Sequence, residues 1–229
     1  PSGVSQLISA LEKDLRFPVL ERMRNGVRLT ENGQRILPIV RAIVQEEDRL
    51  LQLTSEIRGL SIGRVTIASY PSVASHWLPK VLKKFREKFP HIEIRVMEGI
   101  HQEISAWLDQ KEVDFGFMSY DPHTSYDWIP LAHDPMIAVL PTTHPLADAS
   151  SFPLSECSNE DFIMPGKGQD IDTLGVLLRH NLHPRIAYET IETAATLGLI
   201  EAGMGITITN SLSTEKYDFK VSKIPIEPS

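Results

Sequence analysis

Short apolar runs alternate with amphipathic segments from residue 64 to residue 209, and this alternation restricts the fold more than any other feature. The apolar runs predict strands at 64–69, 92–97, 114–118, 135–141, 161–165, 185–189 and 205–209, and the segments between them predict helices at 73–88, 101–110, 172–181 and 191–202. Strands that alternate with helices are typical of α/β folds whose strands run mostly parallel. The two runs of strands fit two small subdomains.

An amphipathic helix is expected over residues 2–15. Its apolar side chains recur at helical spacing, and its polar side chains lie largely on the other side. The apolar set is Val4, Leu7, Ile8, Leu11 and Leu15, and the polar set is Ser2, Ser5, Gln6 and Ser9. Arg16-Phe17-Pro18 should end the helix, because the residue before a proline avoids the helical region.

The next segment, residues 19–30, predicts a two-stranded hairpin. Asn25-Gly26 is a strong signal for a tight turn, and Val27 and Leu29 alternate after it. Three arginines surround the turn, so the hairpin is expected to form a small wing with positive charge. They are Arg22, Arg24 and Arg28.

A long helix is expected from Thr30, which can cap it, to about Arg58. Apolar residues follow alternating steps of four and three along it, which predicts a seam for a partner helix, expected from a second chain. The seam consists of Ile36, Val40, Ile43, Leu50 and Ile57. A helix packed on its own domain is the alternative. Pro38 should kink the helix, and Gly59 and Gly63 indicate a domain boundary.

Charge divides the chain at the same place. The net charge is −7, yet residues 1–62 hold nine Lys and Arg against eight Asp and Glu, whereas residues 63–229 hold fourteen against twenty-two. A basic segment joined to an acidic body indicates two separate tasks. The single cysteine, Cys157, excludes an intramolecular disulfide and a cysteine-cluster zinc site.

Four loops are predicted to form a ligand site, because small molecules bind at the carboxyl ends of strands in open α/β sheets. These loops offer hydroxyls, backbone N–H groups and one cation, which favours an anionic ligand. The alternative is that their residues only cap helices and form turns. The candidate residues are Ser69, Tyr70, Pro71, Ser72, Gly99, Ile100, Ser119, Tyr120, Pro165, Gly166 and Lys167.

The sequence contains no zinc-protease, Walker A or nucleophile-elbow motif. Gly203-Met204-Gly205 follows a predicted helix and precedes a strand, which is the wrong order for a dinucleotide site, so it indicates a helix C-terminal turn. An enzyme would need a serine of the four loops to pair with a histidine, and His76 and His101 lie near two of these loops. No metal and no cofactor is expected.

Residues 2–33 resemble the DNA-binding region of LysR-type transcriptional regulators. The resemblance lies in a Ser-x-x-Ser helix followed by Ala10-Leu11-Glu12, Leu20-Glu21-Arg22 and Arg28-Leu29-Thr30-Glu31-x-Gly33. Signatures similar to those of the same family continue along the rest of the chain at Phe89-Pro90, Val113-Asp114-Phe115-Gly116, His144-Pro145-Leu146 and Gly203-Met204-Gly205-Ile206.

The resemblance implies a partial winged helix-turn-helix at 1–30, a linker and dimerisation helix at 31–60, and an effector-binding domain at 61–229. That domain would have the type 2 periplasmic-binding-protein fold of two Rossmann-like subdomains. Subdomain I would comprise residues 61–138 and a C-terminal return, and subdomain II about 139–212. The backbone would cross near 138–141 and return within 210–224.

Roles follow from the resemblance. The helix at 2–15 would lie in the DNA major groove, with Ser2, Ser5, Gln6 and Ser9 facing the bases. Arg22, Arg24 and Arg28 would contact phosphates or the minor groove. The expected partners are an operator duplex for the full-length protein, a small effector in the cleft, and one or three further copies of the chain, in the cytoplasm and with no membrane.

A solute-binding receptor of the periplasmic type is the main alternative function. It explains residues 63–229 equally well, but it does not explain the basic wing or the long helix.

Overall fold

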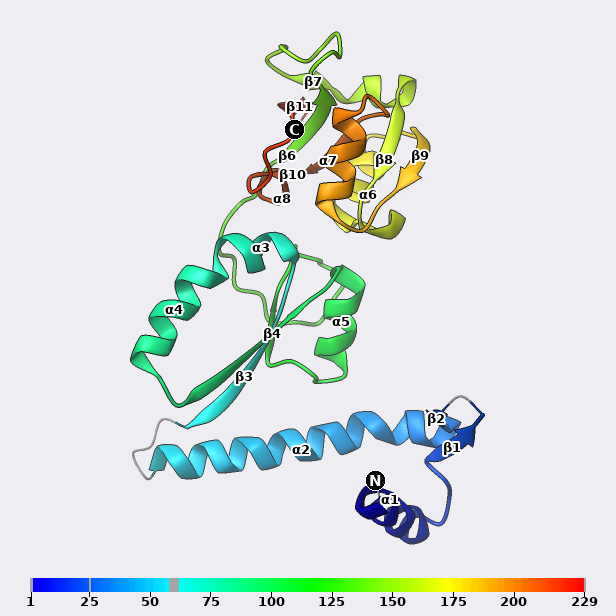
Figure 1. Cartoon of the computed structure of the whole chain (residues 1–229), viewed down its shortest axis with the longest axis vertical. Coiled ribbons are helices and arrows are strands. Elements are labelled where there is room, and N and C mark those ends of the chain that lie inside the picture. Colours follow the sequence, from blue (N-terminus) through cyan, green and yellow to red (C-terminus); the bar gives the residue numbers. More distant parts are fainter. Residues whose placement is uncertain (1, 25, 58–61, 229) are drawn as a thin grey trace.

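The computed structural model describes residues 2–24, 26–57 and 62–228, and it arranges them in three successive parts (Figure 1). A helix and a two-stranded hairpin come first, a long helix follows, and two α/β subdomains complete the chain. The predicted α/β class is confirmed. Asn25, Arg58 and Gly59, on which the predicted turn and helix end depend, lie outside the described residues.

The N-terminal part consists of α1 (Ser2–Leu15), β1 (Leu20–Met23) and β2 (Gly26–Leu29). The strands pair antiparallel, with Leu20 opposite Leu29. The carboxylate of Glu12 accepts hydrogen bonds from the backbone N–H groups of Val19 and Leu20, at 2.8 and 3.1 Å. This carboxylate therefore fixes the end of α1 against the start of the hairpin.

Helix α2 (Glu31–Ile57) begins where Thr30 was predicted to cap it. The Thr30 hydroxyl accepts the N–H of Gly33 at 3.0 Å and donates to the carbonyl of Pro18 at 2.8 Å. Gly33 lies so close to the carbonyl oxygen of Val19 that a Cβ there would clash with it. Pro38 lies inside this helix, and the helix continues from Glu31 to Ile57 without a break at the proline.

Subdomain I contains a parallel sheet in the order β4-β3-β5, with helices on both faces. Its elements are β3 (Gly63–Ser69), α3 (Pro71–His76), α4 (Leu78–Lys88), β4 (Ile92–Glu98), α5 (His101–Asp109) and β5 (Phe115–Phe117). The sequence predicted one helix over 73–88, but the structure has two. They separate at Trp77, because Pro79 has no N–H to continue the helical ladder.

Subdomain II is built on two sheets, one in the order β10-β6-β11-β7 and one of β8 and β9. Its elements are β6 (Met136–Pro141), β7 (Phe152–Pro153), β8 (Asp161–Met164), α6 (Ile171–Arg179), β9 (Arg185–Glu189), α7 (Thr193–Glu201), β10 (Thr207–Asn210), α8 (Ser211–Thr214) and β11 (Val221–Glu227), with 3-10 turns at Leu154–Asn159 and Gly166–Gly168. Strands β10 and β11 both run antiparallel to β6, unlike the mostly parallel arrangement predicted.

The two subdomains meet at α3 and α8 (Figure 1). Leu212 of α8 packs in one apolar cluster with Ile67, Val73 and Leu78 of subdomain I. The predicted division between residues 138 and 139 falls inside β6, whereas the whole of β6 lies in the sheet of subdomain II. The chain therefore passes from one sheet to the other within residues 118–135.

Candidate functional site

The first three predicted loops lie together in subdomain I, since β3, β4 and β5 run parallel and end at the same edge. Ser69 is fully buried, and its hydroxyl donates to the carbonyl of Tyr70 at 2.9 Å. The Tyr70 hydroxyl lies 3.0 Å from Nδ1 of His101, which follows the second loop. The edge of the sheet is thus a hydrogen-bonded surface that faces subdomain II.

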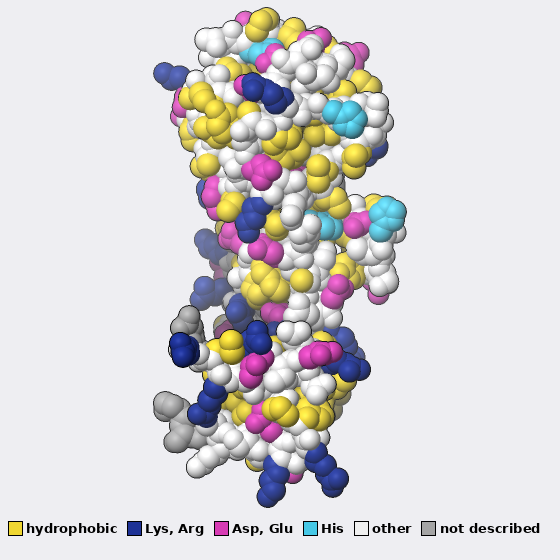
Figure 2. Space-filling model, turned by 90° about the vertical axis from the view of Figure 1, so that its right-hand side faces the viewer, with side chains coloured by type: hydrophobic (Ala, Val, Ile, Leu, Met, Phe, Trp, Pro, Cys, Tyr) yellow, Lys and Arg dark blue, Asp and Glu magenta, His cyan; other side chains and the backbone are white. Residues whose placement is uncertain are grey.

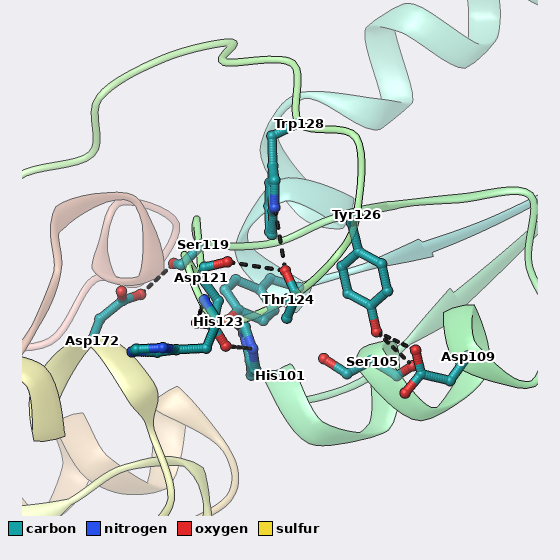
Figure 3. Close-up of polar contacts among 11 residues, drawn as sticks. His101, Ser105, Asp109, Ser119, Asp121, His123, Thr124, Tyr126, Trp128 and Asp172 are labelled. Carbon is teal, nitrogen blue, oxygen red and sulfur yellow. Dashed lines mark hydrogen bonds and ion pairs between the residues drawn. The ribbon is translucent and has the colours of Figure 1, made fainter.

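Two side-chain contacts join this edge to subdomain II. The hydroxyl of Ser119 donates to the carboxylate of Asp172, near the start of α6 (Figure 3). The Lys167 ammonium lies 3.7 Å from a carboxylate oxygen of Glu103 on α5. Two predicted residues, Ser119 and Lys167, therefore bridge the subdomains, and each does so with a carboxylate that sequence reasoning missed.

A further group of side chains, contributed by the segment 119–128, covers α5 (Figure 3). Asp121 lies 3.6 Å from Nε2 of His101. The Tyr126 hydroxyl contacts the carbonyl of Ser105 at 3.1 Å and donates to the Asp109 carboxylate at 2.7 Å. Sequence reasoning missed this group because the segment has no regular periodicity, although Asp121 directly follows the predicted Tyr120.

Burial is the main cause of the pKa shifts of Tyr70 and Asp172, which lie in the cleft between the two subdomains. It raises the pKa of the Tyr70 hydroxyl well above its usual range, and the nearby Asp172 carboxylate raises it further. Burial also raises the pKa of Asp172 itself, with a contribution from Asp170, against the lowering effect of the Ser119 hydrogen bond. The raised pKa keeps the Tyr70 hydroxyl protonated. Outside the cleft, in the groove between α2 and subdomain I, the pKa of Tyr126 rises to about 12, first through burial and then through Asp109.

A cavity of about 180 Å³ lies at the boundary between the subdomains. Hydroxyls, two carboxylates and one ammonium group line it. The lining residues are Pro71, Ser72, Ser75, Glu98, Glu192, Thr193, Ser213, Lys216 and Tyr217. Pro71 and Ser72 belong to the predicted set, whereas the residues from α7 and α8 do not.

Other predicted residues have a visible part in the backbone structure. A Cβ on Gly99 would clash with the ring of Trp107, and Ile100 precedes α5, where its N–H donates to the Glu103 carboxylate at 3.0 Å. Gly166 has a φ of 63°, which favours glycine. Turn formation, the alternative role, thus accounts for part of the predicted loops.

The histidines considered for catalysis have other partners. Nδ1 of His76 lies 2.8 Å from the carbonyl of Ser72 and 3.0 Å from the hydroxyl of Ser75. Ser75 itself donates to the carbonyl of Ser72 at 3.1 Å. Within the described part of the chain, the buried Ser69 hydroxyl bonds to backbone rather than to a histidine.

The predicted DNA-facing residues lie on exposed surfaces of α1 and the hairpin. Ser5, Gln6 and Ser9 are exposed, and so are Arg22, Arg24 and Arg28, whereas the side chain of Ser2 lies outside the described part. Arg28 pairs with Glu21 at 2.5 Å. Several Lys and Arg side chains project from the lower end of the molecule, where these elements lie (Figure 2).

Helix α2 presents two different faces. Its predicted seam is largely open to solvent, with Ile43 and Leu50 63% exposed and Ile57 79% exposed. Another face contacts subdomain I through ion pairs, Arg41 with Glu112 at 2.6 Å and Asp48 with Arg64 at 2.5 Å. A groove of about 1000 Å³ with charged walls lies between them. The structure thus combines contact with its own domain and an unpaired apolar seam.

Comparison with known proteins identifies similar chains. The LysR substrate binding domain matches residues 58–228. The uncharacterised HTH-type transcriptional regulator YvbU of Bacillus subtilis is 29% identical over 214 residues, which is 92% of this chain and 72% of that protein. Among the described residues, every helix is too short or too polar to span a membrane.

Two solved structures show the same fold. The regulatory domain of CcmR from Synechocystis PCC6803, in complex with 2-PG, has a TM-score of 0.64 at 24% identity, over 72% of this chain and 81% of that one. HinK, a LysR family transcriptional regulator from Pseudomonas aeruginosa, has a TM-score of 0.64 at 20% identity, over 100% of this chain and 78% of that one.

Proposed function

Since this chain belongs to the family of LysR-type transcriptional regulators, we propose that the full-length protein binds an operator in the cytoplasm and that a small effector in the cleft controls this binding. One observation carries the proposal: a basic hairpin, an unpaired apolar helix and a two-subdomain domain occur in one chain. A solute-binding receptor has no use for the first two parts.

Each part has a proposed task. The polar face of α1 reads bases in the major groove, and Arg22, Arg24 and Arg28 position the wing on the phosphate backbone. The seam of α2 joins two copies of the chain into a dimer. The complete assembly is either this dimer or a tetramer of two such dimers. An effector that prefers one arrangement of the subdomains shifts the population of DNA-binding arrangements.

The proposed effector site is the boundary bridged by Ser119–Asp172 and Lys167–Glu103, together with the adjoining cavity. These contacts join elements of both subdomains, so a molecule bound among them changes how the subdomains meet. The loop residues Ser69 and Tyr70 support the site from beneath.

Selection from fragmented genomic DNA with the full-length protein tests the proposal. We expect enrichment of a short segment with two related half-sites, and we expect Ser119→Ala or Lys167→Ala to alter regulation from that segment in a reporter strain without abolishing binding. Failure to enrich any segment, with the protein folded and oligomeric, would contradict operator binding. Unchanged regulation in both variants would remove the effector from this cleft.

A further inference from the structure

The side chains along the proposed effector cleft carry more negative than positive charge. Among the residues described there, Asp121 and Glu103 come from subdomain I and Asp172 from subdomain II. Lys167 supplies a positive charge, but its ammonium already faces Glu103 at 3.7 Å. In the adjoining cavity, Lys216 stands with two carboxylates, Glu98 and Glu192.

The carboxylate of Asp172 keeps capacity for a ligand. The Ser119 hydroxyl and the Asn210 side chain occupy two of its lone-pair sites, and an ionised carboxylate offers about four. Asp172 sits in a partly buried position, where charges interact more strongly than in water. A second carboxylate or a phosphate brought next to it would repel it, whereas an ammonium group would pair with it.

An unsatisfied buried group lies in the same place. The side chain of His101 is 10% exposed, and its Nε2 has no hydrogen-bond partner among the described residues, although Asp121 stands 3.6 Å away. Its Nδ1 contacts the Tyr70 hydroxyl at 3.0 Å. When Nδ1–H donates to the Tyr70 oxygen, Nε2 carries a lone pair, and a buried acceptor without a hydrogen bond indicates an N–H donor supplied from outside the chain.

Resting on the proposed function, we infer that the effector of this cleft is a small molecule with at least one protonated amine, which pairs with Asp172 and Asp121. The hydroxyls of the adjoining cavity accept further N–H groups or pair with hydroxyls of the ligand. The loop hydroxyls and N–H groups led the sequence analysis to favour an anionic ligand. The fold brings additional carboxylates to the same cleft, and their negative charge favours a cationic ligand instead.

Three probes with the same four-carbon skeleton test the sign of the ligand charge: 1,4-diaminobutane, succinate and 1,4-butanediol. The melting temperature of the full-length protein is measured with each at equal concentration and ionic strength, because binding to the native state raises it. We expect 1,4-diaminobutane to raise the melting temperature more than the other two. A rise with succinate that is equal or larger, or no difference among the three, would overturn the inference.

Variants locate the effect. Asp172→Asn keeps the size and the Ser119 hydrogen bond, and we expect it to weaken 1,4-diaminobutane binding about tenfold or more, in line with the removal of a charged hydrogen bond. Asp121→Asn is the second variant should Asp172→Asn fold poorly. Asp148→Asn, on an exposed turn away from the cleft, is the control. Equal binding in all three variants would also overturn the inference.

Binding of a random-sequence duplex in the same buffer separates the two proposals. Intact DNA binding with a preference for succinate would reject only the ammonium ligand. If the unmodified protein does not bind the duplex, the proposed function is rejected whatever the three probes show.

Discussion

The hydroxyl of Ser119, which follows the last strand of subdomain I, donates a hydrogen bond to the carboxylate of Asp172 in the first turn of α6 in subdomain II. The two residues are 53 positions apart in the sequence. Their bond closes the cleft between two subdomains that also meet through the apolar packing of α8 on α3.

Removal of this bond should loosen the contact between the subdomains. We expect Ser119→Ala to lower the free energy of unfolding by about 1–3 kcal/mol, because Asp172 loses a partner while it stays partly buried. Small-angle scattering should show a larger radius of gyration. Ser158→Ala, at an exposed serine of subdomain II, is the matched control. An unchanged radius would show that the bond does not hold the subdomains together.

Asp172 should also give a pH-dependent stability. Its pKa is raised from the usual 3.8, mainly by burial, so the folded protein holds this proton more tightly than the unfolded chain does. Ionisation of Asp172 therefore lowers the free energy of unfolding as the pH rises from below 3.8 through the raised pKa of the folded state. We expect the unfolding free energy of Asp172→Asn, relative to the unmodified protein, to increase with pH over this window. A constant difference would contradict the pKa direction.

The fold was largely predictable because it depends on local patterns. Helix α1, the hairpin, the cap at Thr30 and most strands of the α/β domain follow from periodicity and turn residues. Strand β11 was not predicted, since Pro225 interrupts its pattern, although Ile224 and Ile226 point into the core. The antiparallel pairing of β6 with β10 and β11 depends on contacts between distant segments, which periodicity does not reveal.

The site was predictable only in part. The rule that loops follow parallel strands located Ser119 and Lys167, which bridge the subdomains. It did not locate their carboxylate partners, Asp172 and Glu103, because these lie inside helices rather than in loops. Each of these contacts joins a loop of one subdomain to a helix of the other. Such a contact depends on how the two subdomains pack together, which local sequence patterns do not reveal.

The glycines after α7 allow a paired test of backbone geometry. Gly205 has a φ of 148°, and a Cβ there would clash with the carbonyl of Asp161, whereas Gly203 has a φ of 74° and open space around it. We expect Gly205→Ala to cost about 3 kcal/mol or more and Gly203→Ala about 1 kcal/mol, from the left-handed conformation alone. Chemical denaturation measures both. Equal costs would show that the close approach to Asp161 is relieved in solution.

The seam of α2 predicts the effect of a buried charge on assembly. We expect Ile43→Glu to dissociate the oligomer, since it places a carboxylate at the centre of an apolar contact. Sedimentation velocity measures the species present. Gln34→Glu adds the same single negative charge at an exposed position of the helix outside the seam and should leave the oligomer intact. Dissociation by both variants would point to general repulsion rather than to the seam.

The wing arginines should determine how DNA affinity depends on salt. We expect Arg22→Ala and Arg24→Ala to weaken binding of the full-length protein to a random-sequence duplex. Each should reduce the slope of log affinity against log salt concentration by about 0.9 for every phosphate that its arginine neutralises. Fluorescence anisotropy over a series of KCl concentrations gives the slope. Arg179→Ala, on the exposed surface of subdomain II, is the control. A weaker affinity with an unchanged slope would place the arginines away from the phosphates.

Ion pairs connect α2 to subdomain I along a groove that is lined by both charged and apolar side chains. Exposed ion pairs such as Asp48–Arg64 contribute about 0–1 kcal/mol, since water serves the separated charges almost as well. We therefore expect the effector domain to separate from this face of α2 at little cost in free energy, whereas the proposed contact between subunits lies on the apolar seam of another face. On this proposal a single helix combines one contact that is easily broken with a subunit contact that does not depend on it.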